Sequence, residues 1–209
     1  MFHPNSFRAN IEVGKYAASH GNYEEARNWF EQAYKLKPNE IGAKLVQVMT
    51  YCDQPSLENI DLGGVVDSVR GKPLGIYGLS VLNNINLKLV RGQCGSIDKS
   101  FVVDVADVVS RRGLNEYQYR VLAQSYLVGG DYAKASSYYR LAFELQPEIG
   151  LVFELVDGDI RFGNYSAGLD VVNKAIEQVV YKNRFEKIAL VDLQKRLTKY
   201  VVEKGEKGG

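Results

Sequence analysis

The sequence predicts an all-α fold built from consecutive antiparallel helix pairs. Three observations carry this prediction. Apolar residues recur at helical spacing through almost all of the 209 residues. Strand-type alternation and hairpin dipeptides between β-rich runs are missing. The breaks between the apolar stretches are only a few residues long, which forces neighbouring helices to pack side by side. We therefore expect a right-handed helical-hairpin solenoid of about five helix pairs, closed by a C-terminal capping helix.

A repeated phrase sets the length of the unit. Residues 21–38 read GNYEEARNWFEQAYKLKP and residues 130–147 read GDYAKASSYYRLAFELQP. Gly, Tyr, Ala, an aromatic residue, Ala and Pro recur in step, at a constant offset of 109 residues. This offset is close to three units of about 34–36 residues, which indicates a repeat array. No linker interrupts the array, so we expect one domain over residues 1–209.

The first half of the chain predicts six helices. Asn22 is placed to cap the second of them and Ser56 the fourth. Arg111 and Arg112 stand at the end of the sixth, where the helix dipole favours cations. The expected helices cover about residues 6–19, 23–36, 40–51, 56–69, 74–90 and 98–112.

The second half predicts five more helices. Asn115 and Asp131 are placed as N-terminal caps, and Pro147 ends a unit. Glycines at 129–130 and 163 mark two of the breaks. The expected helices cover about residues 116–128, 132–145, 149–161, 165–180 and 184–202, the last being the capping helix.

These residues resemble the tetratricopeptide repeat family, whose unit is a helix–turn–helix of about 34 residues. Small residues at the signature sites would let two helices approach to about 8–10 Å, with rings filling the space beside them. The resemblance is clear over about 7–40 and 116–149. It is partial over 150–182, where Gly168 replaces the usual alanine. Over 41–115 the helix pairs keep the repeat length but almost none of the signature residues. The signature residues are Gly14, Gly21, Tyr23, Ala26, Phe30, Ala33 and Pro38 in the first unit and Tyr119, Leu122, Ala123, Tyr126, Gly130, Tyr132, Ala135, Tyr139, Ala142 and Pro147 in the fourth.

Composition excludes several classes of partner. The formal charge is +1, so no overall field indicates a nucleic acid or a membrane surface, and the fourteen tyrosines fall mostly at packing sites. No run reaches the roughly 18 apolar residues of a membrane span, and the start lacks a signal-peptide pattern. We therefore expect a protein or peptide partner, no nucleic acid, no membrane insertion and a cytoplasmic location. A piece cut from a larger protein is the alternative.

No catalytic constellation is apparent. The two histidines, His3 and His20, and two distant cysteines cannot form a metal site. Residues 64–73 have the wrong spacing for a phosphate loop, and Pro73 stands where a hydroxyl would be needed. We expect no enzymatic activity, no cofactor and no metal. An enzyme or enzyme-regulatory domain acting on sugar or phosphate is the rival, and it would need converging acids.

In stacked helix pairs the first helix of each pair lines the concave face. A mixed-charge groove with an aromatic or two suits an extended peptide or a partner helix, whereas an ordinary polar face without a ligand is the alternative. The candidate partner-binding residues are Arg8, Glu12 and Lys15 in the first unit, Tyr117, Arg120 and Gln124 in the fourth, and Phe153, Glu154 and Asp157 in the fifth.

The chain contains two cysteines, Cys52 and Cys94. Each follows a predicted helix in neighbouring repeats, so one disulfide is geometrically possible, and two reduced, half-buried thiols are the alternative. The arrangement of repeats also resembles the soluble C-terminal regions of bacterial envelope glycosyltransferases and polysaccharide polymerases. That resemblance implies a periplasmic domain of a membrane protein, and with it a Cys52–Cys94 bridge.

The C-terminal segment is basic. From Tyr181 onward eight Lys or Arg residues stand against four acids, which gives +4 there and −3 for the rest of the chain. A solvated end helix accounts for this charge, and a docking surface for something acidic is the alternative. The same helix must cover the last repeat, and an uncovered edge would pair with another copy, so a homodimer is a further possibility.

Overall fold

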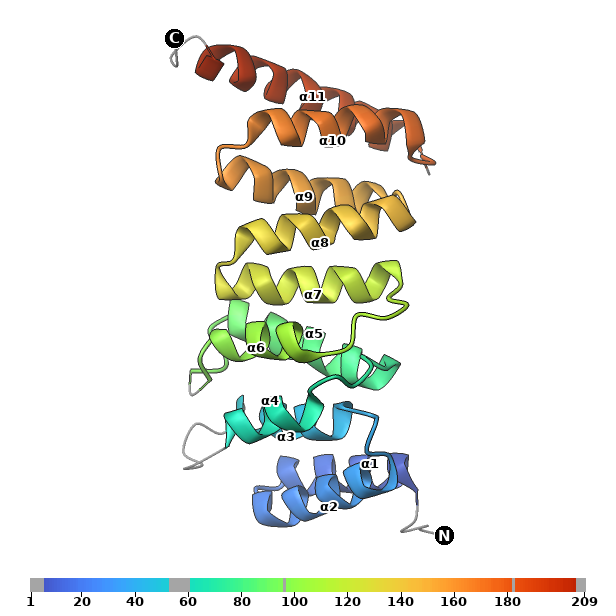
Figure 1. Cartoon of the computed structure of the whole chain (residues 1–209), viewed down its shortest axis with the longest axis vertical. Coiled ribbons are helices and arrows are strands. Elements are labelled where there is room, and N and C mark those ends of the chain that lie inside the picture. Colours follow the sequence, from blue (N-terminus) through green and yellow to red (C-terminus); the bar gives the residue numbers. More distant parts are fainter. Residues whose placement is uncertain (1–5, 53–60, 96, 182, 206–209) are drawn as a thin grey trace. The chain divides into compact units, whose positions relative to one another are not determined.

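The computed structural model describes residues 6–52, 61–95, 97–181 and 183–205, with side chains up to residue 203 (Figure 1). Within these ranges the chain forms eleven α-helices and no strand, apart from one isolated parallel bridge between Pro73 and Ser110. The prediction of an all-α, helical-hairpin repeat fold is confirmed. The described residues divide into two compact units, and the single-domain expectation stays a prediction.

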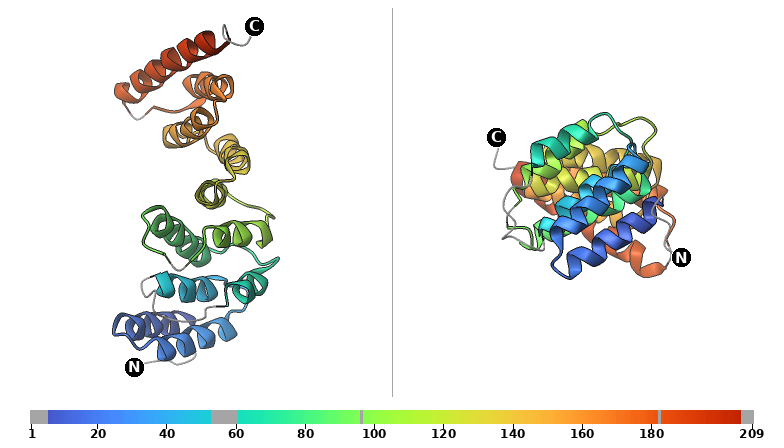
Figure 2. Two further views of the ribbon diagram at one scale, coloured as in Figure 1. Left: turned by 90° about the vertical axis from the view of Figure 1, so that its left-hand side faces the viewer. Right: turned by 90° about the horizontal axis from the view of Figure 1, so that it is seen from below.

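The first unit lies within residues 6–114 and 124–130. Its helices are α1 (Phe7–Ser19), α2 (Tyr23–Leu36), α3 (Gly42–Cys52), α4 (Leu62–Val69), α5 (Ile76–Val90), α6 (Ser100–Val108) and the end of α7 (Glu116–Gly129). Helix α1 packs on α2, α3 packs on both α2 and α5, and α4 packs on α6 (Figure 1 and Figure 2). Large side chains fill the core, among them Phe30, Ile41, Leu45, Leu82 and Ile85.

Helices α1 and α2 cross closely because Gly14 has no side chain. A Cβ at position 14 would lie 2.7 Å from Cδ1 of the fully buried Phe30. Ala26 and Ala33 are buried on the same helix as Phe30. The turn between the two helices places Gly21 at a φ of 80°, a backbone conformation that favours glycine. The small and aromatic residues of the signature therefore stand where the sequence predicts.

The second unit comprises, among the described residues, 115–123, 131–181 and 183–205. It contains the start of α7, α8 (Tyr132–Leu145), α9 (Ile149–Arg161), α10 (Tyr165–Gln178) and α11 (Arg184–Gly205). Helix α9 packs between α8 and α10, and α11 packs on α10 (Figure 2). Leu190 and Leu197 of α11 are fully buried in the same core as Leu151, Leu155 and Val172. The C-terminal helix thus covers α10.

Helix bounds follow the capping chemistry closely. The helices at Tyr23–Leu36, Tyr132–Leu145 and Ile149–Arg161 have the predicted ends. Asp131 accepts a hydrogen bond from the backbone N of Lys134 at 3.1 Å. Asn115 and Gln118 exchange side-chain-to-backbone hydrogen bonds at 2.9 Å in both directions, which is a capping box. Asn22 stands at its cap position but makes no side-chain cap bond.

Two predicted helices have one end that differs from the structure by four residues or more. The helix expected from residue 56 begins at Leu62, and Asp61 is its cap, accepting from Gly64 N at 2.8 Å. The expected cap Ser56 lies outside the described residues. The helix expected to end at residue 112 ends at Val108, because Ser110 donates its backbone N–H to the Lys72 carbonyl at 2.8 Å.

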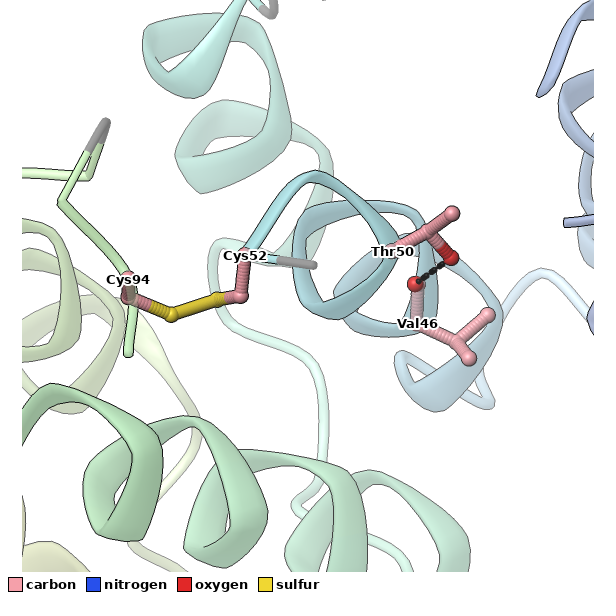
Figure 3. Close-up of a disulfide and its surroundings, with 4 residues drawn as sticks. All are labelled: Val46, Thr50, Cys52 and Cys94. Atoms are coloured by element: carbon pink, nitrogen blue, oxygen red, sulfur yellow. Dashed lines mark hydrogen bonds between the residues drawn. A yellow bond between two sulfur atoms is a disulfide. The ribbon is translucent and has the colours of Figure 1, made fainter. Parts of the chain in front are cut away.

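A disulfide joins Cys52 and Cys94 within the first unit (Figure 3). Cys52 is the last residue of α3, where Thr50 donates its hydroxyl to the Val46 carbonyl at 2.8 Å. Cys94 follows α5, and both cysteines are buried. The bond spans a sequence separation of 42 residues and ties the end of the first helix of one pair to the segment after the first helix of the next pair. Its formation in solution stays a prediction.

Candidate partner-binding surfaces

Two of the predicted residues of α1, Glu12 and Lys15, lie near Tyr77, a tyrosine that the sequence did not single out. Glu12 and Lys15 form an ion pair at 3.1 Å, and Arg8 is exposed. The Lys15 Nζ lies 5.6 Å from the ring centroid of Tyr77 on α5. Phe7 meets the same ring edge to face at 5.9 Å. The ring of Tyr77 therefore occupies part of the space beside Lys15 and Phe7.

Tyr77 reaches this position because α3 begins with a glycine. A Cβ at Gly42 would overlap the Tyr77 ring and would lie 2.9 Å from the Gly78 backbone N. Glu40, just before α3, accepts hydrogen bonds from Gly42 N at 3.2 Å and Gly78 N at 3.0 Å. Burial, helped by the charges of Glu12 and Glu40, raises the pKa of the Tyr77 hydroxyl. Tyr77 is thus a neutral, wedged ring under all ordinary conditions.

Gln124 belongs to the first unit, although Tyr117 and Arg120 on the same helix belong to the second. Its Oε1 atom is buried without a hydrogen-bond partner in the part of the chain that the structure describes. Four of the nine predicted residues, Arg8, Glu12, Lys15 and Gln124, thus belong to the first unit, and the other five belong to the second.

The second unit presents a candidate surface that is centred on Arg120 of α7. The guanidinium contacts Glu154 of α9 at 2.9 Å, Glu116 of α7 at 3.5 Å and Glu148 at 3.8 Å. One cation thus serves three carboxylates, and the local excess is negative. We call these four side chains the Arg120 cluster. The sequence predicted Arg120 and Glu154 but missed Glu116 and Glu148.

The electrostatics of the Arg120 cluster reflect this excess. Burial raises the pKa of Glu116, the charges of Glu148 and Glu154 add to the increase, and Arg120 offsets part of it. Burial alone would lower the pKa of Arg120, but its pairing with Glu154 and the other carboxylates raises it. Arg120 therefore stays charged, and the pKa of Glu116 lies above its ordinary value.

Two exposed aromatic side chains belong to the same pair of helices. Tyr117 of α7 is 46% exposed and Phe153 of α9 is 41% exposed. Asp157, one turn beyond Phe153, pairs with Arg161 of its own helix at 2.8 Å. The helices α7 and α9 thus present apolar rings, one shared cation and surplus carboxylates. Such a surface can bind a partner that offers an apolar side chain and a positive charge.

The described residues show neither a metal site nor a membrane span. They contain no group of three or more His, Cys, Asp or Glu side chains that could hold a metal ion. None of their helices combines the length and the apolar character that crossing a membrane requires.

Comparisons with known proteins agree with the geometry. Residues 7–40 and residues 121–149 each match a family model described as tetratricopeptide repeat. The chain carries tetratricopeptide repeats at these two segments, which confirms the resemblance for both clear units. Repeats of this family generally serve as protein-interaction scaffolds. Among curated proteins none matches the chain significantly.

Several solved structures are similar to the chain. A thermophilic tetratricopeptide repeat protein of Thermus thermophilus shares 20% identity over 94% of this chain and 100% of its own, with a TM-score of 0.40. PilF of Pseudomonas aeruginosa shares 16% identity over 97% of this chain and 93% of its own, with a TM-score of 0.41. Yeast Tom70 shares 11% identity over 98% of this chain and 44% of its own, with a TM-score of 0.46.

Proposed function

We propose that the chain is a non-catalytic scaffold that binds a partner protein through the surface of α7 and α9. The partner segment is an extended peptide or a helix with a Lys or Arg next to an apolar side chain. The observation that carries this proposal is the Arg120 cluster, in which one guanidinium faces three carboxylates while Tyr117 and Phe153 stay exposed. An added cation would relieve the excess negative charge, and the rings would cover the apolar side chain.

The Glu12–Lys15 pair of α1 and the nearby Arg8 give the first unit a weaker candidate surface. Its charges are nearly balanced, and Tyr77 already occupies the space beside Lys15. We therefore do not assign the main site to it.

Peptide selection tests this proposal directly. A random linear peptide library displayed on phage would be panned on the full chain, and enriched peptides would be titrated by calorimetry. We expect enrichment of Lys or Arg beside an aromatic or aliphatic residue. Glu148→Gln removes one carboxylate of the cluster and should weaken binding about tenfold or less, since it is a rim charge.

A matched control keeps the test specific. Glu177 is an exposed acid on α10, outside the α7 and α9 surface, so Glu177→Gln makes the same charge change elsewhere. We expect it to bind the selected peptides as the parent chain does. Enriched peptides without any cation, or equal losses in the two variants, would contradict the proposed surface.

The disulfide supports a second, narrower proposal. A Cys52–Cys94 bond is stable in an oxidising compartment and is rare in a reducing cytosol. We therefore propose the envelope location that the sequence resemblance implies, with the chain as a regulatory region of a larger glycosyltransferase or polymerase. Counting free thiols in the purified chain under denaturing, non-reducing conditions tests it. Two free thiols per chain isolated from its native compartment would end this version.

A further inference from the structure

Helix α11 has two opposite faces with different environments. Its inner face buries Leu190 and Leu197 in the core of the second unit. Its outer face leaves large apolar side chains in solvent, with Phe185 67% exposed, Ile188 51% exposed and Val202 53% exposed. Phe185 and Ile188 lie one turn apart at the start of this face, and neighbouring exposed apolar side chains of this kind are candidates for a contact surface.

The outer face carries a regular spacing. Steps of three and four residues join Phe185, Ile188, Asp192, Lys195, Lys199 and Val202. This is the a and d seam of a heptad, and the buried Leu190 and Leu197 fall at the f position on the opposite side of the helix. We call these six residues the outer seam. Phe185 and Ile188 form one end of the seam, and Lys199 and Val202 form the other. The two middle positions, Asp192 and Lys195, are charged.

We propose that the outer seam of α11 pairs antiparallel with the outer seam of a second copy of this chain. In antiparallel helix pairs an a position meets a d position of the partner helix. That register sets Phe185 against Val202 of the second copy and Asp192 against Lys195 of the second copy. It also lays Ile188 along the aliphatic stem of Lys199 of the second copy. Each contact occurs twice, related by the two-fold axis.

Charge decides the orientation. A parallel pair would place Asp192 against its own counterpart, and Lys195 and Lys199 likewise, so three layers would oppose like charges. The antiparallel register turns the middle layers into opposite charges. Within one chain Lys195 lies 4.0 Å from Asp192, with both side chains more than half exposed, so both groups remain available to a partner helix.

The contact is a weak one by its size. It involves one face of one 22-residue helix, and half of the seam is polar, which costs stability in a coiled coil. The dimer therefore forms reversibly and its population depends on concentration. It uses no residue of the Arg120 cluster, so it is independent of the proposed partner site.

Sedimentation equilibrium of the full chain over a wide concentration range tests the proposal. We expect a monomer–dimer equilibrium in the parent chain, and dissociation about tenfold or more easier in Phe185→Ser, which removes two apolar layers. Phe185 is mostly exposed, so the variant should keep the circular dichroism spectrum and melting temperature of the parent. A parent chain that stays monomeric at every concentration would overturn the proposal and leave this face to a different protein.

Charge exchange tests the register. Lys195→Asp opposes two acids in each middle layer and should weaken the dimer, whereas Lys187→Asp changes the same charge at the c position, off the seam, and should not. Adding Asp192→Lys to Lys195→Asp restores opposite charges only in the antiparallel register. Dimerisation that fails to recover in this double variant would overturn the antiparallel arrangement. A peptide titration on Phe185→Ser reports the Arg120 surface separately, because that surface is untouched.

Discussion

Replacing Gly42 with alanine is the sharpest test of how the first unit is packed. The added Cβ would overlap the ring of Tyr77 and lie 2.9 Å from the backbone N of Gly78, closer than real Cβ contacts come. The backbone cannot move without disturbing α5. The ring is held on its other sides by Phe7 and Lys15. The contact therefore has no inexpensive way to relax.

The expected magnitude combines two opposing effects. Overpacking a well-filled site costs about 1–3 kcal/mol, while replacing glycine by alanine in a helix interior returns up to about 1 kcal/mol. Gly42 is the first residue of α3, so the helix gain there is smaller. We expect a net loss of about 1–2 kcal/mol in the free energy of unfolding. For a chain of this size that lowers the melting temperature by about 2–8 °C.

Thermal unfolding followed by circular dichroism measures the effect, with Gly150→Ala as the control. Gly150 is the second residue of α9, and a Cβ there would meet open space. That variant should melt at or above the temperature of the parent. Adding Tyr77→Ala to Gly42→Ala should leave a smaller loss than the two single losses summed, because the clash is gone. If Gly42→Ala alone melts as high as the parent, Tyr77 does not occupy the space beside Gly42 and the packing argument fails.

Three further predictions concern the bridge, the helix crossing and the pH response. Replacing Cys52 and Cys94 with serine should lower the free energy of unfolding by about 4 kcal/mol, the loop entropy expected for a separation of 42 residues. Equal denaturant midpoints for the parent chain and this variant would contradict the prediction. Ala135 is 2% exposed on α8, so Ala135→Leu should lose about 1–3 kcal/mol in thermal unfolding, whereas the same change at the exposed Ala133 should be near neutral. Binding of a cationic peptide should strengthen as the pH rises through the raised pKa of Glu116, since the ligand favours the ionised carboxylate; calorimetry of Glu116→Gln should show a weaker pH dependence.

The sequence predicted helices best where the ends carry their own chemistry. The helix at Tyr132–Leu145 begins after a capping aspartate and ends two residues before a proline, and its bounds are as expected. The helix at Ser100–Val108 is shorter than expected because a contact distant in sequence ends it. Lys72 accepts a backbone hydrogen bond from Ser110, and Gly71 donates one to the Val108 carbonyl at 2.7 Å. Local periodicity contains no information about such a partner.

In the candidate sites, too, the sequence could predict some contacts and not others. Arg120 and Glu154 are 34 residues apart, one repeat period, so stacking of equivalent helix faces brings them together and the sequence could predict it. Tyr77 lies in the degenerate region, where no signature fixes the register. Its meeting with Lys15 depends on Gly42 leaving room, and that glycine looks like an ordinary helix start in the sequence.

Helix α9 contacts α8 through a buried carboxylate, a different means from the small residues of the signature crossings. Gly168 stands where the family places alanine, yet a Cβ there would make only ordinary contacts of 3.5 Å or more, so packing does not require the glycine. Between α8 and α9 the buried group is Asp159 of α9, which accepts from Arg140 of α8 at 2.7 Å and from the Ser136 hydroxyl of α8 at 3.2 Å. Burial raises the pKa of Asp159 despite these partners. Its contribution to stability is therefore largest at low pH and is lost as the pH rises through the folded pKa, because the unfolded chain ionises first. The contact between α8 and α9 is therefore one place in the second unit where protonation and helix packing are coupled.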